Sequence, residues 1–331
     1  FSALLARHGV KKGDGVAIFL PNSPQFHIAF FGILKLGAVH VPVSPLSRAF
    51  ELAYELNDTG AETIVALDTL MPVVREVKAE TRLRTVFVTR FADVLTDAPT
   101  IPVPESLRTP PEPCDDAIDL MPALAAMGDV VPPPPVSLDD VAALNYTGGT
   151  TGMPKGCVHT QRDMLYTCAT GATASASLAT DDVTLSFMPQ FWIAGEDMAL
   201  LFPVYAGATL VLLTRWDPVA VMTAVQQYQV TCMAMPVEAA FADRVACARV
   251  GRSDFELVAA LERIFLDLQA LREVLAQDAQ APRSVVQYPA HNRSPARKQQ
   301  TVCPTSFGSS PYAALARCRP APNCCDLASP A

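Results

Sequence analysis

The stretch VAIFLPNSPQFHIAFFGILKLGAVHVPV, residues 16–43, decides the fold class, because it places two β-type runs on either side of a helical pattern. The apolar runs predict strands over Val16–Leu20 and Ala38–Val43. The longer segment between them predicts a helix over Pro24–Leu36. Strand, helix and strand in this order are typical of an α/β layer architecture with parallel strands.

The ends of this predicted helix carry their own signals. Asn22 or Ser23 offers an N-cap, and Pro24 suits the first helical turn. Gly37 stands where a left-handed residue ends a helix. This is the most clearly delimited helix in the chain.

The same alternation continues outward from this stretch. Further strands are predicted over Thr63–Leu67, Thr85–Thr89, Val141–Thr147, 157–160, 184–189, Ala208–Leu213 and Val230–Pro236. Further helices are predicted over Arg48–Asn57, Met71–Glu80, from about Gln161, and over Pro218–Gln227. The chain is therefore predicted to be an α/β protein.

Two regions break this pattern. Residues 97–140 are rich in Pro, Asp and Ser and contain the run Pro132–Pro135, so we predict a surface linker between subdomains with one short helix near Leu120–Met127. Beyond about Phe241 glycine nearly vanishes and the composition shifts. We predict one helix over Phe255–Gln277 and a disordered or unnatural segment from about residue 282 onward.

The overall composition excludes several classes of protein. A net charge of −8 and a pI near 5.1 argue against nucleic-acid binding. No run of about 18 apolar residues exists, so no transmembrane segment is predicted. Of the nine cysteines, four are scattered without C-x-x-C spacing, which favours a reduced, soluble, cytoplasmic protein: Cys114, Cys157, Cys168 and Cys232. The first residue is not Met, and no signal peptide is recognisable, so we expect the front of the chain to be missing.

The segment Thr147–Gly156, TGGTTGMPKG, packs four glycines, three threonines and one lysine after an apolar strand. Glycines let successive backbone N–H groups converge on an anion, and Lys155 adds a positive charge suited to phosphate oxygens. It is not a Walker A loop, because Pro154 precedes the lysine and a strand follows. The alternative is a flexible glycine-rich hairpin without a ligand.

Together with its neighbours, this loop resembles the hallmark of the adenylate-forming enzymes, which include acyl-CoA synthetases and fatty-acyl-CoA ligases. KKGDGVAIFLPNSPQFHIAFFGILKLGAVHVPVSP is similar to the family's opening segment, and MPQFWIAGEDMALLFPVYAGATLVLL to the segment that helps form the acyl pocket. The resemblance runs from about Leu4 to Val237. It implies the N-terminal large domain of the adenylate-forming fold, with two stacked αβ subdomains, over residues 1–241. Residues 242–331 form a poorly structured, non-family tail.

The resemblance also implies a reaction. A carboxylic acid, with a fatty or other apolar acid favoured, is activated by Mg²⁺ and ATP to an acyl-adenylate and then transferred to CoA. This places the chain in fatty acid and lipid metabolism. The residues implied to contact phosphate are Thr147, Gly148, Gly149, Thr150, Thr151, Gly152 and Lys155. Thr147 is implied to lie nearest the metal, and Lys155 has a catalytic role.

Trp192 lies in the segment Met188–Gly195, where the family usually has a histidine near the acyl carboxylate. We predict that Trp192 takes this place beside the carboxylate. A tryptophan in an apolar segment is equally typical of the protein core, and that alternative stays open.

Several family residues have no counterpart after Val237. No Tyr-Gly-x-Thr-Glu segment and no Thr-Gly-Asp occur there, and Lys298 is the only lysine. We therefore expect a chain truncated at both ends or frameshifted after about Phe241, with impaired activity; a divergent natural tail is the alternative. Rival functions are an adenylation domain that loads a carrier protein and a catalytically dead nucleotide-binding remnant. The sequence does not determine the oligomeric state.

Overall fold

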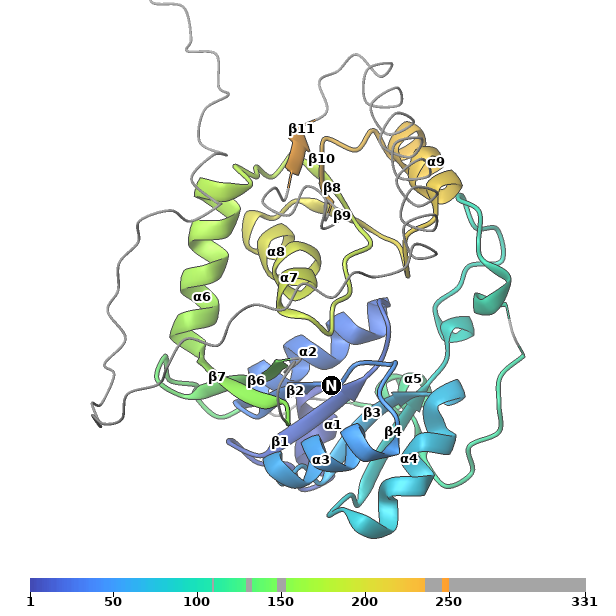
Figure 1. The fold of residues 1–331 in the computed structure, drawn as a ribbon, viewed down its shortest axis with the longest axis vertical. Coiled ribbons are helices and arrows are strands. Elements are labelled where there is room, and N and C mark those ends of the chain that lie inside the picture. Colours follow the sequence, from blue (N-terminus) through green and yellow to red (C-terminus); the bar gives the residue numbers. More distant parts are fainter. Residues whose placement is uncertain (109, 129–132, 148–152, 236–245, 250–331) are drawn as a thin grey trace, which may run out of the picture. The chain divides into compact units, whose positions relative to one another are not determined.

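The computed structural model describes residues 1–108, 110–128, 133–147, 153–235 and 246–249. Two sheets organise these residues (Figure 1). The first has seven strands in the order β5-β4-β3-β1-β2-β6-β7, and the second has four in the order β11-β10-β8-β9. The α/β fold class predicted from the sequence is confirmed.

The first sheet is parallel except for its last pair. Its strands are β1 Gly15–Phe19, β2 Val39–Pro42, β3 Thr63–Leu67, β4 Thr85–Thr89, β5 Ile118–Asp119, β6 Val141–Thr147 and β7 Lys155–Thr160. Only the last two, β6 and β7, pair antiparallel. A short loop joins such a pair, whereas each parallel pair needs a crossover, which the intervening helices and connections provide.

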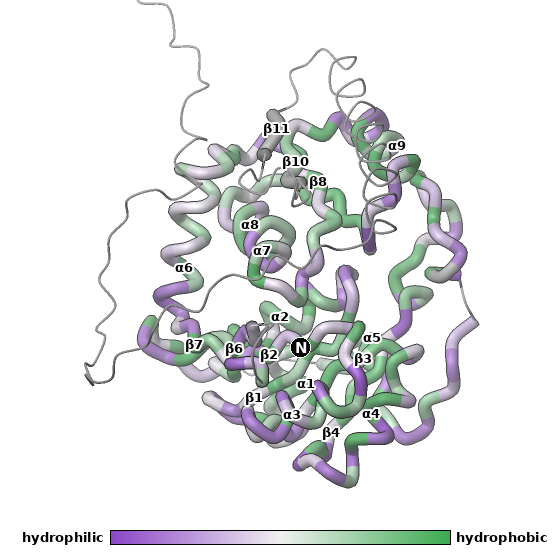
Figure 2. Tube along the Cα trace, viewed as in Figure 1, coloured by the Kyte–Doolittle hydropathy of each residue, from purple (hydrophilic) through white to green (hydrophobic). Residues whose placement is uncertain are grey.

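The helices beside this sheet are α1 Ser2–Arg7, α2 Pro24–Leu36, α3 Ala49–Thr59, α4 Met71–Val77 and α5 Leu120–Ala125. Alternate residues of β1 point to opposite faces, and both faces are buried. Val16 and Ile18 join a core cluster with α2, while Ala17 and Phe19 join a second cluster with α3 and α4. Strands buried on both faces read as continuous apolar runs, as Figure 2 shows for β3.

The predicted bounds of α2 are confirmed. Ser23 is the N-cap, because its Oγ accepts a hydrogen bond from the backbone N–H of Phe26, and Gly37 ends the helix at φ 75°. Of the two candidate caps, Ser23 is therefore the one used. Phe26 and Phe30 lie on the buried face, one helical turn apart.

The second sheet is parallel apart from one pair, β10 with β11. Its strands are β8 Val183–Ser186, β9 Thr209–Leu212, β10 Cys232–Met235 and β11 Ala246–Arg249. The accompanying helices are α6 Gln161–Thr170, α7 Ile193–Glu196, α8 Phe202–Ala206 and α9 Pro218–Tyr228. Two π-helical turns, Gly171–Ser175 and Asp197–Leu201, continue α6 and α7.

Some predicted elements differ from the observed ones. The helix expected over Met71–Glu80 is α4 followed by a 3₁₀ turn at Lys78–Glu80. The linker over 97–140 contains the short helix that was predicted, as α5, but it also supplies β5 to the sheet edge. A two-residue strand is too short to show a periodic pattern in the sequence. The residues of β5 form a strand only because they pair with β4. The predicted helix Phe255–Gln277 and the predicted disordered segment from about residue 282 lie outside the described residues. Of the predicted tail 242–331, only Ala246–Arg249 is described, and it forms β11.

Candidate active site

The hairpin of β6 and β7 carries the glycine-rich loop. Thr147 ends β6, Lys155 begins β7, and the two residues pair directly across the hairpin. The Thr147 hydroxyl donates a 3.4 Å hydrogen bond to the Lys155 carbonyl oxygen. Side chains of directly opposed residues lie on the same face, and both are exposed. The structure therefore places these two residues opposite each other across the hairpin, and both have exposed side chains. The other predicted phosphate contacts, Gly148, Gly149, Thr150, Thr151 and Gly152, lie outside the described residues.

Helix α3 holds this hairpin from one face of the sheet. The Tyr54 hydroxyl donates a 3.0 Å hydrogen bond to the carbonyl oxygen of Pro154, immediately before Lys155. The Tyr146 hydroxyl donates a 2.6 Å hydrogen bond to Oδ2 of Asp58. The two tyrosine rings meet edge to face, with centroids 6.3 Å apart. Both ends of the loop are thus tied to one helix.

The surroundings of Tyr146 keep its hydroxyl protonated, so that it can donate a hydrogen bond. Burial, followed by the hydrogen bond to Asp58, raises the pKa of Tyr146 above its usual value. Glu55, also on α3, is a second acidic group near this ring, and burial followed by the charge of Glu51 raises the pKa of Glu55 to about 7. The protonated phenol therefore persists throughout the physiological pH range.

The segment that contains Trp192 makes a tight turn before α7. The Trp192 backbone N–H donates to the Pro189 carbonyl oxygen at 3.1 Å, and Trp192 is the N-cap residue of α7. A Cβ on Gly195 would lie 1.9 Å from that same oxygen, so the turn requires glycine. The Trp192 side chain is 56% exposed and touches the ring of Phe191 edge to face. The interpretation of Trp192 as a core residue is therefore wrong for this structure.

Buried polar groups fix this segment against the N-terminus of α2. The Gln190 backbone N–H donates to Oδ1 of Asn22 at 2.8 Å, and Gln190 Oε1 accepts from the Ser23 N–H at 3.2 Å. Nδ2 of Asn22 donates to the carbonyl oxygens of Met188 and Leu213. All these amide groups are satisfied, so Asn22, which the sequence suggested only as a cap, joins two chain segments far apart in sequence.

A second buried group lies between β2, β6 and α7. Nδ2 of Asn145 donates a 2.8 Å hydrogen bond to Oε2 of Glu196, and Nε2 of His40 lies 3.7 Å from the same oxygen. His40 and Glu196 are fully buried. Burial, followed by the charge of Glu196, raises the pKa of the adjacent Asp197 to about 7. Two acidic side chains, Glu196 and Asp197, thus follow one another directly in the chain, and the raised pKa of Asp197 favours its neutral form.

Comparison with known proteins identifies the family of this chain. The family model described as AMP-binding enzyme matches residues 1–293. The chain belongs to the AMP-binding enzyme family.

Individual relatives point the same way. The chain is 31% identical over 227 residues to a crotonobetaine/carnitine–CoA ligase of Escherichia coli, covering 67% of this chain and 40% of that protein. It is 32% identical over 236 residues to a long-chain-fatty-acid–CoA ligase of Salmonella typhimurium, covering 68% and 42%. The chain thus spans about two fifths of the length of these AMP-binding relatives.

A solved structure supports the fold. A benzoate CoA ligase from Burkholderia xenovorans aligns with a TM-score of 0.58 at 20% identity, over 70% of this chain and 42% of that one. At this low sequence identity, the alignment shows a shared fold and not a shared function. The N-terminal domain fold predicted for an adenylate-forming enzyme is confirmed.

The described residues of this AMP-binding chain do not form a ready-made metal site. Among them, no cluster of three or more His, Cys, Asp or Glu side chains is placed to hold a metal ion. Mg²⁺ typically keeps several waters and binds through few protein ligands together with phosphate oxygens. The exposed hydroxyl of Thr147 fits such a site, and its role near a metal stays a prediction. No helix in the described part is long and apolar enough to cross a membrane.

Several residues of the site were missed by the sequence analysis. Tyr54 and Asp58 stand four residues apart, which places them on one face of α3. Asn145 is a polar residue inside an apolar strand, and Glu196 is an acid inside an apolar segment. Each polar residue could have been noticed in the sequence, because a buried polar group needs a hydrogen-bond partner. The sequence does not show which residue is that partner.

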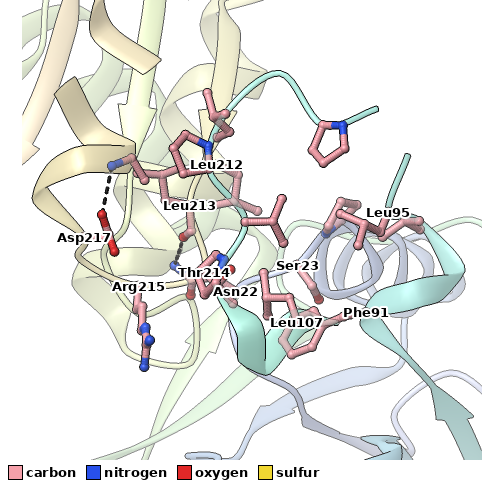
Figure 3. Close-up of a pocket in the computed structure, with 18 of the residues that line it drawn as sticks. Asn22, Ser23, Phe91, Leu95, Leu107, Leu212, Leu213, Thr214, Arg215 and Asp217 are labelled. Atoms are coloured by element: carbon pink, nitrogen blue, oxygen red, sulfur yellow. Dashed lines mark hydrogen bonds between the residues drawn. The ribbon is translucent and has the colours of Figure 1, made fainter. Parts of the chain in front are cut away.

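A separate apolar cavity lies at the start of α2 and the end of β9. It has a volume of about 320 Å³, and Figure 3 shows Asn22, Phe91, Leu107 and Leu213 around it. None of Thr147, Lys155 and Trp192 lines this cavity. Thr147 and Lys155 lie on the β6–β7 hairpin, and Trp192 lies at the start of α7.

Proposed function

We propose that this chain forms the ATP-binding and acid-binding part of an AMP-forming acid–thiol ligase. In the first step a carboxylate oxygen attacks the α-phosphorus of ATP, an acyl–phosphate bond forms, and pyrophosphate leaves with the electrons of the broken P–O bond. In the second step the thiol of CoA attacks the acyl carbon, its proton is released, and AMP leaves. Supporting this proposal are family membership and the CoA ligases among the relatives.

One observation carries the proposal: Thr147 and Lys155 face each other at the end of an antiparallel hairpin that is anchored from α3. A pyrophosphate leaving group needs fixed donors and positive charge where its charge develops. The exposed ammonium of Lys155 supplies the charge, and Thr147 supplies a hydroxyl. The backbone N–H groups of residues 148–152 complete the cradle in this proposal.

For the acid, we propose an apolar carboxylate, with a fatty acid favoured. The exposed ring of Trp192 beside Phe191 offers an apolar surface at the start of α7. Trp192 is proposed to lie against the acyl group near its carboxylate. Mg²⁺, when bound, would neutralise phosphate charge beside Thr147, and CoA is the proposed thiol.

The test is carboxylate-dependent exchange of labelled pyrophosphate into ATP, which reports the first step alone. A series of carboxylates from acetate to palmitate is assayed with this chain and with Lys155→Met. Exchange that depends on both the carboxylate and Lys155 supports the proposal. If MgATP does not bind, as measured by calorimetry, the proposal is wrong.

Two rival functions remain distinguishable. A catalytically dead remnant would bind MgATP without any exchange. An adenylation domain would show exchange but would transfer the acyl group to a carrier-protein thiol instead of CoA, which a gel-shift assay with a pantetheinylated carrier would detect.

We also retain the proposal that residues 1–241 form the family domain and that residues 242–331 depart from it through a frameshift or truncation. The family match extends to residue 293, so the position of this boundary stays a prediction. Translation of the gene in all three frames decides the matter. A downstream family motif in another frame supports a frameshift, and its absence supports a divergent tail. Cytoplasmic location is likewise proposed, and cell fractionation tests it.

A further inference from the structure

Asn145 and Glu196 join the strand that enters the glycine-rich loop to the short helix that begins at Trp192. Their side chains form a 2.8 Å hydrogen bond across 51 residues of sequence, and Asn145 is only 7% exposed. We propose that this hydrogen bond couples phosphate binding at the loop to the conformation of the Trp192 segment. Asn145 and Glu196 are then positioning residues. The inference rests on the proposed function.

On the strand side, Asn145 is rigidly linked to the phosphate loop. Asn145 and Thr147 are two residues apart in β6, so their side chains lie on the same face, about 7 Å apart along the strand. The intervening residue, Tyr146, points to the opposite face, where Asp58 holds it. In this proposal, a displacement of Thr147 by a bound phosphate reaches Asn145 through the short part of β6 that joins them, which is paired with β7.

On the helix side, Glu196 is one turn away from Trp192. The Glu196 backbone N–H donates a 2.8 Å hydrogen bond to the Trp192 carbonyl oxygen. The helix α7 comprises only Ile193–Glu196, so Glu196 and Trp192 move together. The exposed indole of Trp192 at the start of the helix would change its surroundings in this movement, so its fluorescence can be used to detect it.

The same carboxylate has a second neighbour. Nε2 of His40 lies 3.7 Å from Oε2 of Glu196, which is too long for a hydrogen bond but close enough for a small rotation to make one. Both ring nitrogens of His40, Oε1 of Glu196 and Oδ1 of Asn145 are buried without hydrogen-bond partners. Edge contacts with Phe26 and Phe30 hold the His40 ring in place. In this proposal Glu196 exchanges its bond to Asn145 for one to His40, because coupling between sites requires an element with two arrangements.

The test follows Trp192 by fluorescence. Trp216→Phe removes the only other tryptophan and keeps an aromatic ring against Phe187. Mg-pyrophosphate is the probe, because it occupies the phosphate loop without an adenine that could touch the indole. We expect saturation of the chain with Mg-pyrophosphate to shift the fluorescence emission of Trp192. Asn145→Leu in the same Trp216→Phe background should reduce that shift by at least about half, because a ligand changes a conformation only if it interacts differently with the two conformations. Binding itself, measured by calorimetry, is retained.

Two control variants separate coupling from general damage. Glu196→Gln keeps an oxygen that accepts from Asn145, so it should keep the response. Thr231→Val removes a 2.8 Å hydrogen bond to Asp182 in the second sheet and should also leave the response unchanged. Amide hydrogen exchange of Ile193–Glu196 in the unsubstituted chain provides a readout that needs no substitution, and pyrophosphate should slow it.

The outcomes are distinct. A full response in Asn145→Leu, or unchanged exchange at residues 193–196 while pyrophosphate binds, overturns the coupling and leaves the proposed function standing. If neither pyrophosphate nor MgATP binds the parent chain, the proposed function is wrong, and so is the proposed coupling.

Discussion

The hydroxyl of Tyr54 donates a 3.0 Å hydrogen bond to the carbonyl oxygen of Pro154, one residue before Lys155. A residue of α3 therefore fixes the end of a loop that lies 100 residues further along the chain. The relationship makes α3 part of the candidate site, although its sequence carries no phosphate-binding motif.

Tyr54→Phe should weaken MgATP or Mg-pyrophosphate binding by about two- to tenfold, because a typical net hydrogen bond contributes about 0.5–1.5 kcal/mol. Calorimetry measures the effect. The matched control is Tyr166→Phe, which changes an exposed tyrosine in α6. Equal affinities for all three proteins would show that the hydroxyl does not position the loop.

Lys155→Met should reduce pyrophosphate affinity by about tenfold or more, since a charge-assisted contact to phosphate is lost while the apolar stem is kept. Lys155→Arg should recover part of the loss because it keeps the charge. Thermal unfolding should change little in either variant, given the exposure of this side chain. An unaltered affinity in Lys155→Met would remove Lys155 from the site.

Trp192→Ala should leave the free energy of unfolding within about 0.5 kcal/mol of the parent, because the indole is mostly exposed. Under the proposed function it should raise the carboxylate concentration needed for half-maximal exchange while MgATP affinity stays the same. Val204→Ala, at an exposed position in α8, is the control. A parallel loss of MgATP affinity would argue against a specific role at the acid.

Gly195→Ala should destabilise the chain by about 2 kcal/mol or more, since the added Cβ would overlap the Pro189 carbonyl oxygen and force backbone movement. Gly128→Ala meets no atom within 4 Å and serves as the control. Differential scanning calorimetry compares the two. Similar melting temperatures would mean that the turn at Pro189 adapts without strain.

Asp197 should make stability depend on pH. Burial, followed by the charge of Glu196, raises the pKa of Asp197 from 3.8 to about 7, so the folded state binds this proton more tightly than the unfolded state. The contribution of Asp197 is complete below about pH 4 and is lost as pH rises through about 7. Asp197→Asn should flatten the fall of the unfolding free energy across this window, as measured by urea titration.

Cys168 of α6 is coupled to the same group. Burial, followed by the charge of Asp197, raises the pKa of the Cys168 thiol to about 11, so the thiol stays protonated across the window used for Asp197. A pH dependence that Asp197→Asn leaves intact would have to come from other groups, with Glu55 the first to test by Glu55→Gln.

The helix α2 shows which structural features can be predicted from neighbouring residues alone. Its cap, its first-turn proline and its terminal glycine all act within the segment itself, so its bounds were predictable to the residue. The two strands on either side of the glycine-rich loop were predictable for the same reason, because the apolar run, the glycines and the second strand follow one another in the sequence. The β5 strand was not, since two residues become a strand only by pairing with β4.

The sequence by itself determined the α/β class, the hairpin around Thr147 and Lys155, and the family to which the chain belongs, because these depend on short-range periodicity and a contiguous motif. Only the tertiary structure decided that Tyr54 anchors Pro154, that Asn145 meets Glu196, and that Trp192 is exposed. Each of these depends on residues far apart in sequence. Parallel strands joined by crossovers bring such residues together, and no local pattern encodes which buried donor finds which acceptor.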